Sequence, residues 1–291
     1  MASMRELKGR INSVNSSHKI TGAMKMISSA KLRKVQSALE HLVPFRKQLR
    51  STLNNLLGDD REYQSPLTEQ RPVRRVAFVV FGSDEGLCGA FNVSLFKLLL
   101  ESMNRTNEEL GESPEYVVYP VGKKVASSVA KMGGVEVADV TYLHSRSGGD
   151  AVKQLSDELT RRFLAHEIDR VELVYFHFKS VGVQTLSTRV LLPVRVADLS
   201  DAPKDAYPTP YIYEPDSETI FRTVLPLYVR STLHETWLDS KTSEEASRIM
   251  AMQMANDNAK KLLESLQLEY NKLRQQNITA ELLDILGGSV Q

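Results

Sequence analysis

The last stretch of this chain, Glu244 to Leu286, carries apolar residues at three- and four-residue steps and contains neither Pro nor Gly. This spacing places side chains along one stripe of an α-helix. At about 1.5 Å per residue, the stretch would form one rod of about 60 Å. A rod of that length cannot wrap inside a compact domain, so its apolar stripe must lie against another extended element.

A partner for this rod is present at the other end of the chain. Residues 1–58 repeat the same spacing, which predicts a helix from about Ser3 to Leu57 that ends at Gly58, a residue suited to closing helices. Two amphipathic helices at opposite termini predict a long antiparallel coiled coil that buries both stripes. Pro44 should bend the first helix. For either helix alone, core packing in a helical domain is the alternative.

The pattern between the two helices changes to alternating strands and helices. A polar, exposed linker is predicted at 59–72 and a central domain at 73–215; the C-terminal helix, 216–291, should be capped by Asp216 and kinked at Pro226. The predicted strands are Val76–Phe81, Tyr116–Val121, Val135–Val140, Val171–Phe178 and Thr188–Val194, and the predicted helices are Ser94–Asn104, Lys124–Met132 and Gly148–His166. The predicted fold class is therefore α/β: a long antiparallel coiled coil of the terminal helices plus a central Rossmann-like domain. Its sheet should be largely parallel, and the last two strands could pair antiparallel at its side.

Basic residues are concentrated at the N-terminus, although the whole chain carries 37 Lys and Arg against 36 Asp and Glu. Residues 1–50 contain eleven Lys or Arg and two acids. A basic helix of this kind should face an acidic partner surface or a polyanion, with a solvated face as the alternative. Nucleic acid is disfavoured as a partner because Phe45 is the only aromatic residue before Tyr63.

Cysteine content and hydropathy indicate the cellular compartment in which the chain resides. Cys88 is the only cysteine, so an intramolecular disulfide is excluded and a reducing compartment is favoured. No apolar run reaches the roughly 18 residues that a membrane span needs. The N-terminus resembles neither a signal peptide nor a transit peptide. We therefore expect a cytosolic chain, or one that reaches a membrane through other proteins.

The most motif-like string, Gly82 to Asn92, lies where nucleotide-binding α/β proteins place a phosphate loop. It contains neither GxxxxGK[ST] nor GxGxxG, and Asp84 and Glu85 would repel phosphate. A tight turn with close backbone packing is the favoured interpretation. Cys88 within it could be a reactive thiol, but a small buried packing residue is favoured. The histidines lack metal-ligand spacing and no catalytic motif is visible, so the residues predict no active site, cofactor or metal.

A polar string, Arg274 to Asn277, interrupts the apolar stripe where the C-terminal rod should extend past its partner. Beyond it, Ile278, Leu282 and Ile285 are again apolar. A frayed tail is one interpretation of such a terminus. An apolar tip behind a polar collar is also the pattern of a helix inserted into a protein socket, with hydrogen bonds at the collar.

Three strings of this sequence resemble the gamma subunit of the rotary F-type ATP synthase. They are RINSVNSSHKITGAMKMISSAKLRK (Arg10 to Lys34), SDEGLCGAFN (Ser83 to Asn92), and SRIMAMQMANDNA followed by LQLEYNKLRQQNITAELLDILGG (Ser247 to Gly288). The resemblance follows the whole chain in order, and the terminal strings are highly specific. Glu85 stands where the family usually has Arg.

The resemblance implies a rotor shaft that couples rotation of the c-ring to conformational change at the catalytic beta subunits. In the family the coiled coil turns inside a ring of alpha and beta subunits, and the α/β domain attaches to epsilon and the membrane-embedded c-ring. The chain itself would perform no covalent chemistry and need no cofactor, because the nucleotides and magnesium bind to its partners. A bacterial enzyme on the cytoplasmic face of the plasma membrane is the implied location. A small-molecule enzyme and a non-rotating coiled-coil adaptor with an α/β domain are the alternatives.

The resemblance also implies contact residues. By this resemblance, the residues of this chain that would contact the beta subunits are Arg274, Gln275, Thr279, Glu281, Met24 and Arg248. Arg274 and Gln275 would hydrogen-bond a beta-subunit loop, whereas Met24 and Arg248 fall where the two helices meet the moving domains of the beta subunits. Tyr211 and Tyr213 match positions that approach the c-ring and epsilon.

Overall fold

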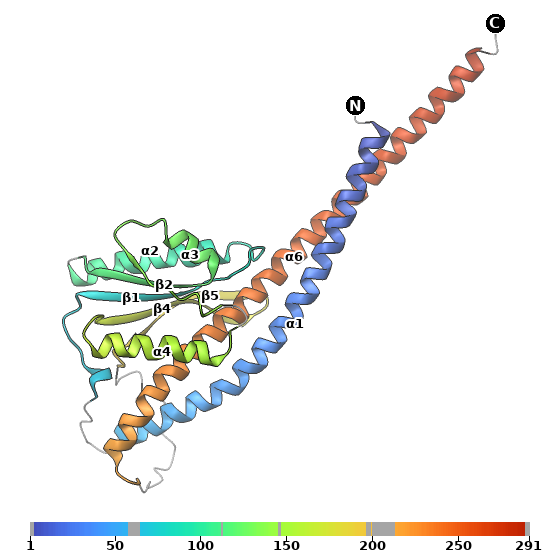
Figure 1. The fold of residues 1–291 in the computed structure, drawn as a ribbon. Coiled ribbons are helices and arrows are strands. Elements are labelled where there is room, and N and C mark those ends of the chain that lie inside the picture. The colour runs from blue at the N-terminus through green and yellow to red at the C-terminus, as the bar shows by residue number, and fades with distance from the viewer. Residues whose placement is uncertain are drawn as a thin grey trace.

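The computed structural model describes residues 3–57, 65–111, 113–144, 147–195, 199 and 213–288. Its helices are α1 (Met4–Leu57), the 3-10 helix η1 (Pro66–Thr68), α2 (Phe91–Leu110), α3 (Lys123–Val129), α4 (Gly149–Leu164) and α6 (Ser217–Gly288). Its strands are β1 (Arg75–Phe81), β2 (Glu115–Val121), β3 (Glu136–Val137), β4 (Arg170–Ser180) and β5 (Val183–Leu192). Figure 1 shows a layered sheet domain beside a long projection formed by α1 and α6.

Helices α1 and α6 lie against each other and run antiparallel, so both termini of the chain lie at the end far from the sheet domain (Figure 1). We call this pair the shaft. It confirms the predicted coiled coil. α6 has 72 residues and α1 has 54, and α6 extends past the start of α1 (Figure 1). Neither helix is interrupted by its internal proline, Pro44 or Pro226. Asp216 caps α6, since its carboxylate accepts a hydrogen bond from the Thr219 N–H at 2.8 Å.

The sheet has the strand order β3-β2-β1-β4-β5. β1 pairs parallel with β2 and β4, and β2 pairs parallel with β3. β5 pairs antiparallel with β4 because only Val181 and Gly182 separate the two strands, a link too short for a parallel crossover. The predicted, largely parallel sheet with an antiparallel pair at its side is confirmed.

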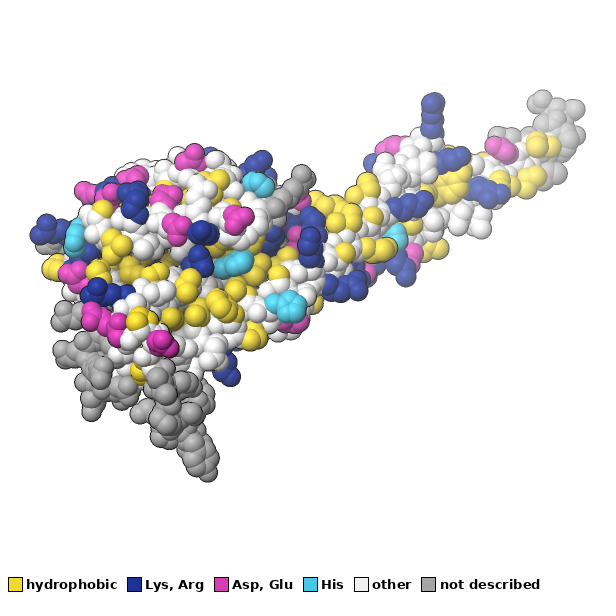
Figure 2. Space-filling model, turned by 60° about the horizontal axis from the view of Figure 1, so that its bottom comes forward, with side chains coloured by type: hydrophobic (Ala, Val, Ile, Leu, Met, Phe, Trp, Pro, Cys, Tyr) yellow, Lys and Arg dark blue, Asp and Glu magenta, His cyan; other side chains and the backbone are white. Residues whose placement is uncertain are grey.

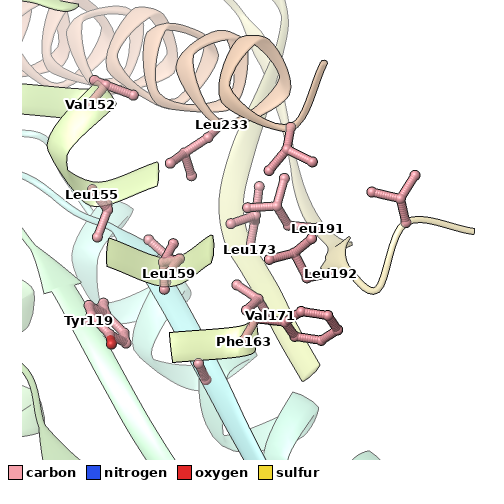
Figure 3. Packing of buried hydrophobic residues seen from close by; sticks show 14 of the residues in the cluster. Tyr119, Val152, Leu155, Leu159, Phe163, Val171, Leu173, Leu191, Leu192 and Leu233 are labelled. Carbon is pink, nitrogen blue, oxygen red and sulfur yellow. The ribbon is translucent and has the colours of Figure 1, made fainter. Parts of the chain in front are cut away.

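Two hydrophobic cores cover the two faces of the sheet. Alternate residues of β1 point to opposite faces, as the period of a strand requires: Phe78 belongs to the core under α2 and α3, and Val79 to the core under α4 and the shaft. Figure 3 shows the second core, where α4, β4, β5 and α6 contribute side chains. Leu53 of α1 and Leu233 of α6 are fully buried in it. One core therefore joins the sheet to both terminal helices at the base of the shaft.

Three predicted elements differ clearly from those observed: α2, β3 and β5. β5 runs from Val183 to Leu192 and not from Thr188 to Val194, because it pairs with β4 up to the two-residue link between them. α2 continues beyond Asn104 because Thr106 extends its buried face, and it closes at Gly111, whose φ of 68° is in the left-handed region. β3 spans only Glu136 and Val137, both exposed; the Ala138 N–H still donates to the Val118 carbonyl of β2, but residues 138–140 form no further strand and a turn begins at Thr141.

The described part of the predicted linker, residues 65–72, packs on the sheet domain. Leu67 is 4% exposed. The Arg71 guanidinium donates to the Asp169 carboxylate at 2.7 Å and lies 4.4 Å from the ring centroid of Phe163. Residues 65–72 therefore pack against the sheet domain, whereas their polar composition predicts an exposed linker.

Candidate functional site

Polar residues along one face of α6 fasten the shaft to the sheet. The Ser240 hydroxyl donates to the Phe81 carbonyl at 2.9 Å, at the end of β1. The Asp239 carboxylate accepts the Phe178 N–H at 2.8 Å, and Ser243 donates to a carbonyl of β4 at 3.2 Å. Directional bonds to two strands therefore supplement the shared core.

The turn between β1 and α2 is built around Gly82 and Asn92, and Gly82 packs against Gly122 at the start of α3. Asn92 accepts the Ser83 N–H at 3.0 Å through Oδ1 and donates to the Ser83 hydroxyl at 2.7 Å through Nδ2. A Cβ on Gly82 would lie 2.7 Å from the Val125 Cβ, and one on Gly122 would lie 2.8 Å from the Gly82 carbonyl. The predicted tight turn with close backbone packing is confirmed.

Cys88 is a packing residue of this turn. Its side chain is 2% exposed and belongs to the core under α2. Burial raises the pKa of its thiol, so the reactive thiolate is disfavoured. The buried role predicted for Cys88 is confirmed.

Replacing Gly82 by Ala is expected to lower the free energy of unfolding by about 1–3 kcal/mol, because the added methyl group would overlap the Val125 side chain. Chemical denaturation of the purified chain measures this. Gly86→Ala is the control in the same turn: a Cβ there meets only Lys124 Cε at 3.8 Å, and we expect a change within about 0.5 kcal/mol. Equal effects of the two substitutions would contradict the packing role of Gly82.

A buried charge cluster lies where α6 passes this turn. Arg248, 3% exposed, donates to Glu244 at 2.5 Å and pairs with Glu245 at 3.0 Å. The same guanidinium also donates to the carbonyls of Glu85 and Gly86, each at 3.4 Å. Arg248 therefore connects the shaft to the backbone of the turn.

Burial and ion pairing act on this cluster in opposite directions. Burial raises the pKa of Glu244 to about 7, although Arg248 opposes the rise. Burial disfavours the charged guanidinium, but Glu244 and Glu245 outweigh it and raise the pKa of Arg248. Arg248 is therefore a permanent positive charge that holds two acids inside the protein.

Directional polar contacts set how α1 and α6 pair. The Asn256 amide donates to the His18 carbonyl at 2.7 Å and to the Thr21 hydroxyl at 3.2 Å. A Cβ on Gly22 would come within 3.4 Å of the same amide. Lys25 and Gln253 form a further hydrogen bond between the helices. Polar pairs inside a helical interface fix its register.

The shaft exposes large apolar side chains beside its basic ones. Met26 is 71% exposed, Ile20 59% and Ile27 56% on α1, and Met254 is 58% exposed on α6. Figure 2 shows apolar and Lys or Arg side chains interspersed along the shaft beyond the sheet domain. Met24 is half-buried in this region. Exposed apolar surface of this extent is typical of a protein contact.

The tip of the shaft, residues 271–288, carries most of the predicted beta-subunit contacts. Its side chains Arg274, Gln275, Thr279 and Glu281 are all exposed, and the Thr279 hydroxyl donates to the Gln275 carbonyl within the helix at 2.9 Å. Farther on, Ile285 is 69% exposed. The tip is thus a single helix with a polar collar and exposed apolar residues beyond it.

The remaining predicted site residues lie elsewhere in the molecule. Arg248 is buried within the chain at the β1–α2 turn, and Tyr213 is half-buried against the core under the shaft. Tyr211 lies outside the described residues. The predicted residues therefore form no single site; they lie at the tip, in the middle of the shaft and at its base.

Sequence reasoning missed the polar face that fastens α6 to the sheet and the ion pairs of Arg248. A signal was present for both: Asp239, Ser243 and polar neighbours recur at helical spacing, and Glu244 and Glu245 precede Arg248 by one turn. Polar residues at buried positions of a shaft indicate a second packing partner, here the sheet.

Within the described ranges, no group of His, Cys, Asp or Glu side chains is placed to hold a metal ion. Among the described helices, none has both the length and the apolar character needed to cross a bilayer. The fold is therefore an exposed two-helix shaft fastened to an α/β domain, and the exposed apolar side chains of the shaft are typical of the class of protein that contacts other chains.

Comparison with known proteins identifies the assembly. The family described as ATP synthase matches residues 3–290. The ATP synthase gamma chain of Bacteroides fragilis is 43% identical over 291 residues and covers 100% of both chains. That of Flavobacterium johnsoniae is 38% identical over 295 residues, covering 99% of this chain and 98% of the relative. The chain belongs to the ATP synthase gamma-chain family.

Solved structures share the fold. The chain resembles one from the Tetrahymena thermophila mitochondrial ATP synthase central stalk and c-ring, with a TM-score of 0.56 and 23% identity over 81% of this chain and 99% of that one. It also resembles one from the Euglena gracilis mitochondrial ATP synthase rotor, with a TM-score of 0.58 and 19% identity over 94% and 98%. At these identities the likeness concerns the fold.

Proposed function

We propose that this gamma chain is the central rotor shaft of a proton-translocating F-type ATP synthase and couples c-ring rotation to conformational change at the catalytic beta subunits. The observation that carries the proposal is the shape: α6 extends past α1 as a single exposed helix, while the base of the shaft is fastened to a sheet domain on one side. Such a shaft is asymmetric about its own axis.

Asymmetry is what the mechanism requires. Chemically identical catalytic sites can differ only when something biases them unequally, and an asymmetric shaft contacts each beta subunit differently at any angle. Torque then corresponds to the difference in contact free energy between successive angles. The basic α1, with its exposed Met26 and Ile27, supplies both charge and apolar area for these contacts.

Individual residues receive roles by their place on the shaft. Arg274 and Gln275 would hydrogen-bond a beta-subunit loop, and Thr279 and Glu281 would lie beside it. Met24 would contact the moving domains of the beta subunits from the middle of the shaft. Arg248 would act through the turn it holds, presenting Glu85 toward the same domains, because its own guanidinium is occupied within the chain.

The sheet domain would attach to the epsilon subunit and the c-ring, with Tyr211 and Tyr213 in that contact. The Tetrahymena structure is described as central stalk and c-ring, which supports this arrangement. In this function the chain is non-catalytic and needs no cofactor, since nucleotide and magnesium bind to its partners. It would reside on the cytoplasmic face of a bacterial plasma membrane, held there through the c-ring.

A rotation assay tests the proposal. Gly133 is an exposed position where an added Cβ meets nothing within 4 Å, and the native Cys88 is 2% exposed, so Gly133→Cys offers a selective attachment point for a probe. In an immobilised complex supplied with ATP, we expect the probe to rotate continuously in one direction. A complex that hydrolyses ATP while the probe stays fixed would favour the alternative, a non-rotating adaptor.

A further inference from the structure

An arginine-rich cleft lies where the base of the shaft meets the antiparallel edge of the sheet. Its volume is about 510 Å³, and α1, α2, β4, β5 and α6 all contribute to its wall. The arginines that line it are Arg46, Arg50, Arg105, Arg170, Arg189 and Arg195. Glu109 and Glu172 are the acids in the same wall, and Glu235 beside it pairs with Arg46, which leaves an excess of three positive charges.

The acids of the cleft are already paired. Glu172 is 1% exposed and accepts ion pairs from Arg170 at 2.7 Å and Arg105 at 3.6 Å. Glu109 pairs with the same two arginines, at 3.1 Å and 3.8 Å. The remaining positive charge of the cleft is therefore left without a counter-charge from these acids.

Several donors of the cleft have no partner among the described residues. Arg50 and Arg189 form no ion pair there, and the Nε atoms of Arg50 and Arg170 are buried without a hydrogen bond. Thr232, 4% exposed, also lines the cleft with an unbonded hydroxyl. Buried polar groups are nearly always hydrogen-bonded, and leaving them unpaired is costly. These buried atoms do not themselves reach the open cleft, so the case for an acceptor ligand rests on the guanidinium groups of Arg50 and Arg189, which line the cleft and form no ion pair among the described residues.

We propose that this cleft binds a small multivalent oxyanion of the phosphate class. Arginine guanidinium groups match such an anion because their forked donors bind two oxygens at once. A concave cleft lined by arginines from α1 and β5 suits a compact anion better than an extended chain. The bound anion would connect Arg50 of the shaft to Arg189 of the sheet and so strengthen the attachment of the shaft to the sheet domain.

Calorimetric titration of the purified full chain with sodium pyrophosphate, at an ionic strength held constant with NaCl, tests the proposal. We expect saturable binding to one site per chain. Arg50→Gln and Arg189→Gln should each weaken it about tenfold, since each removes charge-assisted hydrogen bonds. The control is Arg33→Gln combined with Arg222→Gln, which removes two exposed arginines outside the cleft and should leave the affinity unchanged.

A lipid headgroup would present the same chemistry as a free anion, so a second arm uses phosphatidic acid vesicles with phosphatidylcholine vesicles as reference. Pyrophosphate binding without vesicle binding supports a free anion, and vesicle binding that pyrophosphate displaces supports a headgroup. A heat of binding that does not saturate with increasing pyrophosphate would overturn the proposal. So would cleft variants that bind pyrophosphate as tightly as the control variant. So would an acidic peptide that binds the cleft and that pyrophosphate does not displace. Arg189→Lys keeps the charge but loses the fork, and its weaker binding would separate anion recognition from misfolding.

Discussion

The double variant Arg274→Ala plus Gln275→Ala should lower ATP turnover by the assembled complex about tenfold or more. Both side chains are exposed in the isolated chain, so their loss should leave its fold and its thermal unfolding unchanged. In the proposed complex, both side chains become central, water-excluded contacts between the tip of the shaft and a beta subunit. Truncating such contacts costs about 2 kcal/mol or more of binding free energy. Because every turnover depends on those contacts, the effect appears in the rate of the complex.

The matched control is Lys261→Ala plus Gln267→Ala, which removes one cation and one amide from exposed positions in the paired part of α6. We expect its turnover to stay near that of the unaltered complex. Steady-state ATP hydrolysis by purified complexes of verified subunit composition gives the comparison. If the tip variant turned over ATP as fast as the control, the tip would not transmit torque and a passive adaptor would be the better account.

Arg248→Ala should lower the free energy of unfolding of the purified chain by about 3–5 kcal/mol. The guanidinium pairs with Glu244 at 2.5 Å and Glu245 at 3.0 Å, and both acids are less than 9% exposed. Without Arg248, nothing of comparable strength opposes the effect of burial on Glu244, so its pKa should rise further, and Glu245 loses its ion pair at 3.0 Å. The carbonyls of Glu85 and Gly86 also lose a donor, so the β1–α2 turn should loosen.

Arg222→Ala provides the contrast, because Arg222 pairs with Glu218 at 2.7 Å on the same helix but is 64% exposed. Exposed pairs of this kind contribute about 0–1 kcal/mol. Urea denaturation of both variants measures the difference. A loss at Arg248 no larger than that at Arg222 would mean that water reaches the cluster in solution.

The architecture followed from the sequence because its signals are local and long. The apolar stripe from Glu244 onward repeats over many helical turns, and β1 is a short continuous run of Val, Ala and Phe, which is typical of a strand buried on both faces. The antiparallel pairing of β4 with β5 was allowed for because the two strands are adjacent in the chain, although the prediction began the second strand at Thr188 and the structure begins it at Val183. Each of these features is specified by neighbours in the chain.

The parts that could not be predicted depend on residues far apart in the chain. The cleft unites Arg50 of α1 with Arg189 of β5, which are far apart in the chain. Likewise, the length of α2 was decided by the burial of Thr106 and not by helix propensity, and Arg248 became an interior residue because the turn after β1 folds over it. Tertiary packing sets these features, and no local pattern encodes them.

The core beneath the shaft combines Leu53, strands of the middle of the chain, and Leu233. A ribosome delivers these segments in order, so α1 emerges long before the helix that covers its apolar stripe. Contacts of such large sequence separation form slowly and leave apolar surface open meanwhile. The nascent chain therefore cannot complete its interior until α6 has been released, and during synthesis α1 depends on other proteins or on transient collapse for protection.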